Sequence, residues 1–429
     1  MLPEGDWGRV RGNPNRRCRT HRANLSRCQK TNACCILSHI SKDKSEQERR
    51  DTMRVSVLQD KLAKGLSIVG RAVENRPTLP VLGNILLATG DSRVKLAATN
   101  LEMSITTWIG AKIEQEGGIT LPARTLADLV NNLSPERVDL ALDVATQTVN
   151  VRCGATVSNI KGIDASEFPL IPEGGPEDVV LPGKVFKEMI TQTVFAAAKE
   201  DNRPILTGIL MQFDGSVMTM AAADGYRLAV RTMEIEQHFP QMREFVVPAR
   251  ALSEVGRIIS EEDETVSISL PGERDLVMFH MRYTDVATQL LDGKFPDFAS
   301  IIPRHYVTAT TMYTSDLLSA CKRAEIFARD SAYSAKLSVK PASGPGEPGA
   351  VRIIGMSAER GDNEGMIDAS VEGEELYISF NIRYLIDVLN VVSDERVVFE
   401  SNGAANPGVV RPENRDDFVC VIMPMATGR

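Results

Sequence analysis

The chain has 429 residues, of which 43% are hydrophobic and 25% are charged, and its formal net charge is −8. These fractions are typical of a soluble globular protein, and no segment approaches the ~20 consecutive apolar residues that a membrane-spanning helix needs. The charge is uneven, because residues 1–52 hold 12 Lys and Arg against 6 Asp and Glu, which leaves a net charge of −14 on residues 53–429.

Residues 1–52 are rich in Arg, Asn and Ser and show no apolar periodicity. The apolar stretch ACCIL is too short for the core of a secretory signal. The segment also holds four cysteines and two histidines, but their spacing fits no standard zinc finger. We therefore expect a disordered extension, or upstream sequence read through to a natural start at Met53. The cysteines and histidines are Cys18, Cys28, Cys34, Cys35, His21 and His39.

From Met53 onward, one arrangement occurs three times. Each copy opens with an amphipathic helix, because apolar residues recur at helical spacing. In the first two copies, two alternating strands follow around a Gly-Asp or Asp-Gly turn, in NILLATGDSRVKLAATNLEMSI (84–105) and GILMQFDGSVMTMAAADGYRLAV (208–230). Such turns suit tight hairpins. The apolar helix positions are Leu62, Leu66, Val69 and Val73; Phe186, Met189, Ile190 and Thr193; and Leu317, Cys321 and Ala324.

A second strand and helix then close each copy, in the segments 117–142, 243–270 and 376–401. Each of these helices carries an Arg in its first turn, and its apolar residues are spaced i, i+3, i+7. The arginines Arg124, Arg250 and Arg383 correspond, and the apolar sets are Leu126, Leu129 and Leu133; Leu252, Val255 and Ile259; and Leu385, Val388 and Val392.

The interval of about 130 residues is too long for a solenoid repeat and predicts three copies of a whole domain. Pro-rich joints at 164–178 and 292–305 mark the boundaries. We expect domains at 53–175, 176–303 and 304–429, each burying its own core. The fold class is α+β, with two helices lying on antiparallel sheet in each domain. A chain built this way favours a symmetric scaffold over an enzyme with one pocket.

No catalytic motif is found. The body has no phosphate-binding Gly-rich loop, no nucleophile elbow and no HExxH helix. Its histidines, His238, His280 and His305, stand apart from Cys and carboxylates in the sequence, and the acidic run EEDE (261–264) reads as a solvated turn. The three cysteines after residue 52 each lie in an apolar run, which indicates buried free thiols in a reducing compartment. We expect no metal and no cofactor.

The motifs RPTLPVLGN, ATNLEMSI, AAADGYRLAV, VVPARAL, DGKFPDF, ISFNIRYLIDVLN and VIMPM occur in this order along residues 53–429. Together they resemble the bacterial DNA polymerase III β subunit family, the replication sliding clamps. The resemblance implies the DNA clamp fold, and a homodimer closed head-to-tail into a six-domain ring whose helices line the hole.

In such a ring the helices face duplex DNA and bind it without regard to sequence, because phosphate contacts give position and not specificity. A net-negative body with cations gathered on the inner helices suits this arrangement. The residues expected to face DNA are Lys64, Arg71, Arg76, Arg124, Lys199, Arg203, Arg250, Arg257, Lys322, Arg323 and Arg383.

The resemblance also implies a pocket between the second and third domains for short, largely apolar peptides of the polymerase, the clamp loader and repair polymerases. Leu, Met and Pro side chains suit varied apolar partners. Tyr226 stands where relatives often have His, Ser300 where some have Arg, and the chain continues after VIMPM as ATGR. The pocket residues are Leu206, Ala223, Gly225, Tyr226, Arg227, Leu228, Pro296, Ser300, Ile301, Asn381, Tyr384, Met423, Pro424 and Met425.

The function expected is therefore that of a cytoplasmic, nucleoid-associated processivity subunit without catalytic residues of its own. The alternatives are an enzyme with its site between domains and a multi-domain scaffold that does not encircle DNA. A scaffold has no reason to gather cations on two helices per domain, so charge placement distinguishes it from a clamp.

Overall fold

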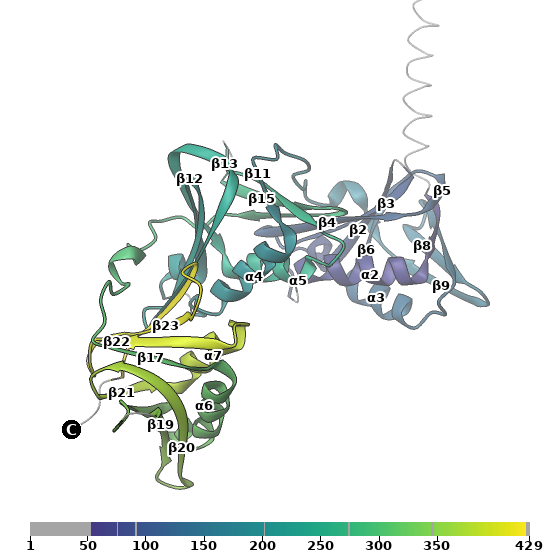
Figure 1. Cartoon of the computed structure of the whole chain (residues 1–429). Coiled ribbons are helices and arrows are strands. Elements are labelled where there is room, and N and C mark those ends of the chain that lie inside the picture. The colour runs from purple at the N-terminus through teal and green to yellow at the C-terminus, as the bar shows by residue number, and fades with distance from the viewer. Residues whose placement is uncertain are drawn as a thin grey trace, which may run out of the picture.

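The computed structural model describes residues 53–74, 76–90, 92–200, 202–272, 275–344 and 347–425. The expectations for residues 1–52, and for the terminal ATGR, lie outside these ranges. The described chain forms an arc of three similar repeats (Figure 1).

The first repeat has two long helices. Its elements are β1 (Arg54–Leu58), α2 (Gln59–Val69), η1 (Gly70–Ala72), η2 (Pro80–Gly83), β2 (Asn84–Gly90), β3 (Arg93–Thr99), β4 (Met103–Gly110), β5 (Lys112–Gln115), β6 (Gly118–Pro122), α3 (Ala123–Asn131), β7 (Arg137–Asp143), β8 (Thr148–Cys153), β9 (Thr156–Lys161), β10 (Ile163–Asp164) and η3 (Ala165–Glu167).

The second repeat follows the same order with longer strands. Its elements are β11 (Val179–Pro182), α4 (Gly183–Val194), η4 (Pro204–Thr207), β12 (Gly208–Ala223), β13 (Arg227–Pro248), α5 (Ala249–Ile258), β14 (Thr265–Ser269), β15 (Leu276–Met281), β16 (Thr284–Gln289) and η5 (Phe298–Ser300).

The third repeat completes the described chain. Its elements are β17 (Thr308–Tyr313), α6 (Thr314–Ala328), η6 (Arg329–Ser331), β18 (Ser334–Lys340), β19 (Gly349–Ser357), β20 (Gly361–Gly373), β21 (Leu376–Asn381), α7 (Ile382–Val391), β22 (Arg396–Ser401), β23 (Gly408–Pro412) and β24 (Phe418–Ile422).

Four of the α-helices in the described ranges, α3, α4, α5 and α7, begin after a residue that suits a helix N-terminus, whereas α2 and α6 follow Leu58 and Tyr313, which make no side-chain cap. Pro122, Pro182 and Pro248 directly precede α3, α4 and α5, where proline costs little because its missing N–H would have no intrahelical partner. Asn381 precedes α7, and its side-chain oxygen accepts the backbone N–H of Arg383 at 3.1 Å. That contact is the N-cap bond that asparagine commonly makes.

The apolar stripes of the first helices face the sheets, as predicted: Leu62, Leu66 and Val69 are buried, and so is Phe186. Val73 was wrongly included, because α2 ends at Val69 and Val73 is half-buried beyond it. The predicted stripe of α3 is partly wrong. Leu129 is only half-buried, whereas Val130 is fully buried, and Leu133 lies beyond the helix end. Nine residues make only two and a half turns, so the i+7 position falls outside the helix.

The sheets cross the boundaries between repeats, which the sequence did not indicate. β4 of the first repeat pairs antiparallel with β16 of the second, and β13 of the second pairs antiparallel with β24 of the third. The strand orders are therefore β10-β6-β2-β3-β4-β16-β15-β14-β11 and β12-β13-β24-β23-β22-β17-β20-β19-β18-β21, beside a separate sheet β5-β1-β7-β8-β9. Each repeat contributes its own helices but shares its sheets.

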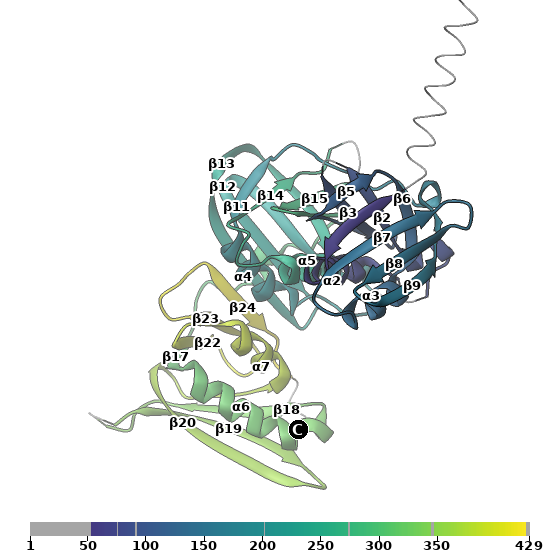
Figure 2. The same ribbon diagram turned by 90° about the vertical axis from the view of Figure 1, so that its right-hand side faces the viewer.

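The helices lie on the concave side of the arc and the sheets on its outside (Figure 1). Helices α2, α3, α4 and α5 follow the lower side of the first two repeats, and α6 and α7 face the same hollow from the third. In the turned view, α6 and α7 stand in front of the strands of their repeat (Figure 2). The three cysteines of the described chain are buried, as predicted, but they are not spread one to a repeat: Cys153 lies in the first repeat, and Cys321 and Cys420 both lie in the third.

Candidate nucleic-acid interface and peptide-binding surface

Positive charge is concentrated on the helices. The six α-helices carry ten Lys and Arg against seven Asp and Glu, a net charge of +3, although residues 53–429 together carry −14. The rest of residues 53–429 therefore carries a net charge of −17. Because the helices line the concave side, the inside of the arc attracts an anion that the outside repels.

All eleven cations expected to face DNA are exposed. They lie on the helices or in the segments that follow the first helix of a repeat. Lys64 is on α2, Arg71 on η1, Arg76 before η2, Arg124 on α3, Lys199 and Arg203 between α4 and η4, Arg250 and Arg257 on α5, Lys322 and Arg323 on α6, and Arg383 on α7.

Four of these cations are held by carboxylates. Arg71 and Arg257 both reach Glu254, at 3.0 and 2.6 Å. Arg124 lies 3.8 Å from Asp128. Such exposed pairs stabilise little, but they lower the local positive charge and hold the guanidinium groups in place.

The fourth is Arg383, which contacts Glu325 at 2.9 Å and stacks 3.6 Å above the ring centre of Tyr333. The other seven cations form no ion pair with a residue that the structure describes. Arg203 differs from the rest in position, because a Cβ built on Gly225 would lie 3.2 Å from its Nη1 atom. It therefore borders the peptide-binding surface as well.

The residues predicted to bind peptides lie where the second and third repeats meet, and the surface that they form is called the peptide-binding surface below. Beyond β24 the chain continues across the joint: the backbone N–H of Met423 donates to the carbonyl of Tyr226, and that of Met425 to the carbonyl of Ser379, both at 2.8 Å. Tyr226 belongs to the second repeat and Ser379 to the third. The C-terminal segment is thus fixed to both repeats.

Arg227 of the second repeat also contacts the third repeat. Its guanidinium contacts Asp224 at 3.0 Å and Asp387 at 2.5 Å, and it lies 4.5 Å above the ring of Tyr384. The arginine is buried, so its charge requires these partners. Arg227 therefore orders the surface, and the two aspartates are members of the site that sequence reasoning missed. A nearby DxxR pattern, Asp224 to Arg227, is the signal that could have indicated one of them.

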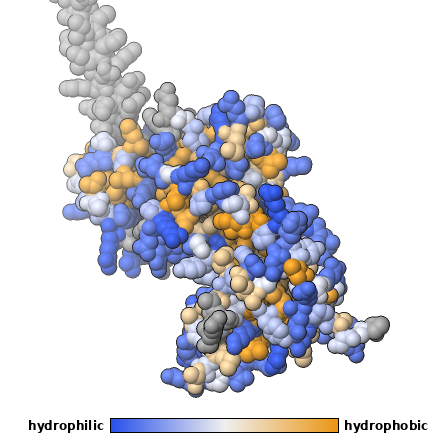
Figure 3. All heavy atoms as spheres, turned by 90° about the vertical axis from the view of Figure 1, so that its left-hand side faces the viewer, coloured by the Kyte–Doolittle hydropathy of each residue, from blue (hydrophilic) through white to orange (hydrophobic). Residues whose placement is uncertain are grey.

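Beneath this surface lies a compact apolar cluster. Leu206, Ala223 and Leu228 are buried in it together with Phe295 and Val421, which the sequence did not single out. Above it, apolar side chains remain exposed: Tyr226 is 64% exposed, Met423 is 41% exposed, and Ile301 is also exposed. The left-hand side of the molecule shows hydrophobic residues along its middle, where upper and lower bodies meet (Figure 3).

The remaining predicted pocket residues lie at the rim. Pro296 and Ser300 are exposed, and the Ser300 hydroxyl donates to the carbonyl of Asp297 at 2.8 Å. Gly225 has a φ of +89°, a left-handed conformation that favours glycine. Asn381 and Pro424 are half-buried.

A half-buried charge network holds the same joint at its far end. Arg415 contacts Glu188 at 3.2 Å, Asp394 at 3.3 Å and Asp417 at 3.0 Å, and Arg231 also pairs with Asp417. Burial would raise the pKa of Asp417, but its hydrogen bond to Arg415 and the charges of both arginines outweigh this, and the pKa is lowered. The ionised network therefore stabilises the joint at neutral pH.

One chain of contacts has the connectivity of a hydrolase triad. The Ser269 hydroxyl lies 2.8 Å from Nε2 of His280, whose Nδ1 lies 3.1 Å from Asp285. However, the Ser269 hydroxyl donates to the carbonyl of Pro176 at 2.6 Å, and the serine is buried. We interpret the group as an anchor for the segment between the first two repeats. His280 was predicted to stand apart from carboxylates only along the sequence, and the fold brings it into contact with Asp285.

Within the described ranges, no three or more His, Cys, Asp and Glu side chains are grouped to hold a metal ion. None of the described helices combines the length and the apolar character needed to cross a membrane.

Family models match the three repeats in order. The N-terminal domain of the DNA polymerase III beta subunit matches residues 53–172, its central domain matches 180–297, and its C-terminal domain matches 299–426. The chain belongs to this family.

Similar proteins agree with the family models. The beta sliding clamp of Bacillus subtilis is 31% identical over 388 residues, which cover 87% of this chain and all of the relative. The crystal structure of the B. subtilis sliding clamp matches with a TM-score of 0.82, at 30% identity, over 88% of this chain and all of that one. The clamp of Pseudomonas aeruginosa bound to griselimycin matches with a TM-score of 0.80, at 28% identity, over 87% of this chain and all of that one.

These findings confirm the predicted clamp fold and the predicted function of a processivity subunit rather than an enzyme. They do not support the alternative of a scaffold that never encircles DNA.

Proposed function

We propose that two copies of this chain close head-to-tail into a ring of six repeats that encircles duplex DNA. The observation that carries the proposal is the repeated joint. Within the chain, β4 pairs with β16 at the first joint, and β13 pairs with β24 at the second. By its position in the repeat, β20 is the equivalent of β4 and β13. In the same way, β9 is the equivalent of β16 and β24. Among the described residues, β9 pairs only with β8, and the first half of β20 pairs only with β19. Each end of the arc therefore carries one half of such a joint, β9 at one end and β20 at the other. The joint that these two halves would form between two copies is called the open joint below.

The two closed joints define the register of the third. Ile105 faces Val286 in the first joint, and Ala229 faces Cys420 in the second. The corresponding positions in the open joint are Asn363 and Ser158. The Oδ1 atom of Asn363 is buried and has no hydrogen-bond partner among the described residues. A serine hydroxyl from a second copy would satisfy it, whereas a buried acceptor without a partner costs about 1–3 kcal/mol.

Exposed apolar side chains also lie on these two strands. Val157 on β9 is 53% exposed, and Met366 on β20 is 68% exposed. Antiparallel pairing of β9 with β20 of a second copy would cover both edges, and an unpaired edge strand is otherwise a site of uncontrolled association. A two-fold arrangement uses both open ends of each chain and leaves no edge of this kind.

Duplex DNA fits the ring by charge. The exposed cations of the six helices would contact phosphates and release counterions, which gives sequence-independent binding that weakens steeply with salt. The ion pairs at Arg71, Arg124, Arg257 and Arg383 moderate this attraction, which suits a ring that must slide rather than stay in place.

The test of the DNA-facing surface uses charge reversal. Changing Arg76 and Arg203 to Glu should reduce the fraction of rings retained on nicked circular DNA after loading, with unchanged thermal unfolding. Lys336→Glu, an exposed cation on β18, is the matched control and should leave retention unchanged. Equal retention in both variants would show that Arg76 and Arg203 do not face the duplex.

Partner peptides would bind over the joint between the second and third repeats. A Leu or Phe side chain fits against Leu228 and Met423, and the exposed Tyr226 forms the opposite side. Partners of this class are the polymerase catalytic subunit, the clamp loader and repair polymerases. Because these partners act on DNA, the protein would work at the nucleoid in the cytoplasm.

The test is peptide affinity measured by calorimetry on a variant with Leu228→Ala and Met423→Ala. Loss of a central apolar anchor contact costs about 2 kcal/mol or more, so affinity should fall at least about 30-fold while the sedimentation mass stays that of the dimer. Unchanged affinity in a folded dimer would show that partners bind elsewhere.

A further inference from the structure

The first joint repeats the backbone arrangement of the peptide-binding surface. In the second joint, two backbone hydrogen bonds fix the segment after β24 to both repeats. The segment after β16 makes the equivalent two bonds in the first joint: the N–H of Gln289 donates to the carbonyl of Glu102, and that of Leu291 to the carbonyl of Val246, both at 2.9 Å. Glu102 belongs to the first repeat and Val246 to the second. The first joint therefore has a surface at the position where the second joint has the peptide-binding surface.

A cavity of about 170 Å³ lies at this position. Strand pairing puts its floor on the face of the sheet away from the helices. Ser104 lies opposite Ala287, whereas the neighbouring Met103 points the other way, into the apolar core that the helices cover. Leu276 pairs with Gln289, two residues beyond Ala287, so both share the face of Ser104. A cavity of about 150 Å³ can hold a group as large as benzene. The cavity is called the first-joint groove, and its lining includes Leu101, Glu102, Ser104, Pro169, Leu170 and Gln289.

Two leucines that line the first-joint groove are exposed to solvent. Leu170 is fully exposed, and Leu101 is 50% exposed. Leu101 also has a φ of +75°, a left-handed conformation that favours glycine. The equivalent residue of the second joint is Gly225, whose φ is +89°. Stability alone therefore favours glycine at both positions, and the exposed leucine is available for contact with a partner.

The turn that carries Leu101 is held in place by hydrogen bonds. The carbonyl of Leu101 accepts the side-chain amide of Gln289 at 3.2 Å, and its N–H donates to the hydroxyl of Thr99 at 3.0 Å. The side-chain oxygen of Asn100 accepts the N–H of Met103 at 2.8 Å. Because the exposed leucine is already fixed, a partner that covers it pays little to order the protein.

The first-joint groove differs from the peptide-binding surface in charge. Of the described residues that line it, Glu102 is the one with a charged side chain. Glu102 is exposed, stands at the position of Tyr226, and forms no ion pair with a residue that the structure describes. A Lys or Arg of the partner would complement this carboxylate, and the negative charge of the chain outside its helices favours the same sign of partner.

We propose that the first-joint groove binds a second short peptide of a partner protein, with a Leu side chain between Leu101 and Leu170 and a Lys or Arg beside it at Glu102. The inference rests on the proposed function, because the equivalence of the two joints indicates the class of occupant. The Ser104 hydroxyl at the floor can donate a hydrogen bond to the peptide backbone or accept one from it. Both surfaces lie at the same end of their ladders, so one partner can occupy both with two segments, which raises its apparent affinity.

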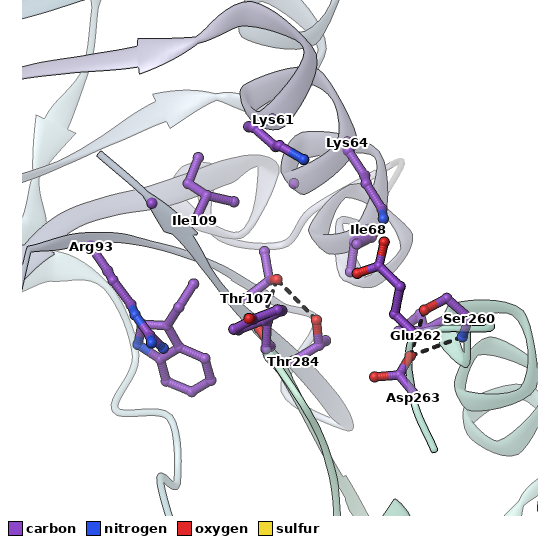
Figure 4. A pocket seen from close by; sticks show the side chains of 15 residues that line it. Lys61, Lys64, Ile68, Arg93, Thr107, Ile109, Ser260, Glu262, Asp263 and Thr284 are labelled. Carbon is purple, nitrogen blue, oxygen red and sulfur yellow. Dashed lines mark hydrogen bonds between the residues drawn. The ribbon is translucent and has the colours of Figure 1, made fainter. Parts of the chain in front are cut away.

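The first-joint groove is separate from the DNA-facing side of the joint. At the other end of the same ladder, Thr107 and Thr284 are hydrogen-bonded at 2.9 Å, beside α2 with its Lys64 (Figure 4). A Cβ built on Gly65 of α2 would lie 3.7 Å from the Thr107 methyl group, so Thr107 faces the helix. Ser104 is three positions earlier in the same strand and faces the opposite side. DNA in the ring and a peptide in the groove can therefore be bound at the same time.

The test uses the full chain with the peptide-binding surface weakened by Leu228→Ala and Met423→Ala. A capped, fluorophore-labelled peptide, Ala-Arg-Leu-Leu-Ala, is titrated with this variant, and its anisotropy is measured. Saturable binding is expected to persist. The same peptide with Glu in place of Arg should bind at least about tenfold more weakly, because its carboxylate would face that of Glu102.

Further changes in the same background locate the binding. Leu101→Gly with Leu170→Ser should weaken the affinity at least about tenfold, because both apolar contacts are lost. The fold should be unaffected, since Leu170 is exposed and glycine suits the left-handed backbone of Leu101. Glu102→Gln should remove the preference for the Arg peptide over the Glu peptide. Ile326→Ser, at another exposed apolar side chain on α6, is the matched control and should change nothing.

Any of four results would overturn the proposal. The first three are no saturable binding in the background variant, equal affinity after the Leu101 and Leu170 changes, and equal affinity for the Arg and Glu peptides. The fourth is a changed sedimentation mass in the Leu101 and Leu170 variant, which would show that a second copy of the chain covers the groove. Calorimetry of partner peptides on the Leu228 and Met423 variant reports separately on the peptide-binding surface, so failure of the proposed function is distinguishable.

Discussion

The register of the open joint predicts a specific pair of outward-facing side chains. If Asn363 lies opposite Ser158 of the partner chain, the next positions along the ladder place Asp362 opposite Asn159 of the partner chain. Both side chains are exposed in the single chain. Asn159→Asp would place two carboxylates opposite one another. The variant keeps the oxygen that accepts the Asn150 amide at 2.8 Å, so the fold should be unaffected.

The expected magnitude follows from the geometry of a strand pair. Directly opposed Cβ atoms lie about 5 Å apart. Two like charges at that distance repel by about 1 kcal/mol in a water-like environment and by about 3 kcal/mol at an effective dielectric constant of about 20. The ring contains two such joints, so even the lower value gives about 2 kcal/mol, or about a 30-fold weaker dimer. The lower value is expected because both residues are exposed.

Sedimentation equilibrium at low and high salt measures the effect. The Asn159→Asp dimer should dissociate at low salt and recover as salt screens the repulsion. Asp362→Lys in the same chain should restore the dimer, because each joint then holds a Lys opposite an Asp. Asn159→Lys alone should dimerise at least as well as the original chain. If Asn159→Asp leaves the mass unchanged, or Asp362→Lys fails to restore it, the register drawn from the two closed joints is wrong.

Three further outcomes are expected. The pKa of Asp417 is lowered in the folded protein, so its ionised form stabilises the fold at pH values above the ordinary pKa of aspartate, and this stability is lost as the pH falls through the lowered pKa. Asp417→Asn should therefore flatten the acid side of a plot of melting temperature against pH. An unchanged slope would contradict this. Burial raises the pKa of the Cys321 and Cys420 thiols to about 12, so peptide mapping after alkylation at neutral pH should find both unmodified until denaturant is added. Gly225→Ala should cost about 1–2 kcal/mol of unfolding free energy, because the left-handed backbone there is strained for alanine; a denaturant titration showing no loss would refute it.

Much of the fold could be predicted from the sequence, because local patterns repeat. The stripes of α2, α4 and α6 are contained in the spacing of residues such as Leu62, Phe186 and Leu317, and a spacing rule depends only on the helix period. Three occurrences of one order of strands and helices indicated three domains. The α3 stripe was misassigned, because nothing in the sequence marked Asn131 as the end of that helix.

The candidate sites depended more on the family resemblance than on chemistry visible in the chain. Leu228 and Met423 are apolar residues like many others, and only their meeting over one joint makes a surface of them. Asp387 lies 160 residues from Arg227, so no local motif could connect them. The first-joint groove and the network around Arg415 were likewise missed, since both join segments from different repeats.

The sequence by itself determined the repeated domain, the position of the helices within it and the excess of positive charge on those helices, because each depends on neighbours within one element. Only the tertiary structure decided that the sheets run across the joints, that Arg415 binds carboxylates of both repeats at the second joint, and that β9 and the first half of β20 each keep one edge without a partner among the described residues. Those features arise from contacts between residues more than a hundred positions apart. Such contacts depend on the packing of whole elements and leave no period in the sequence.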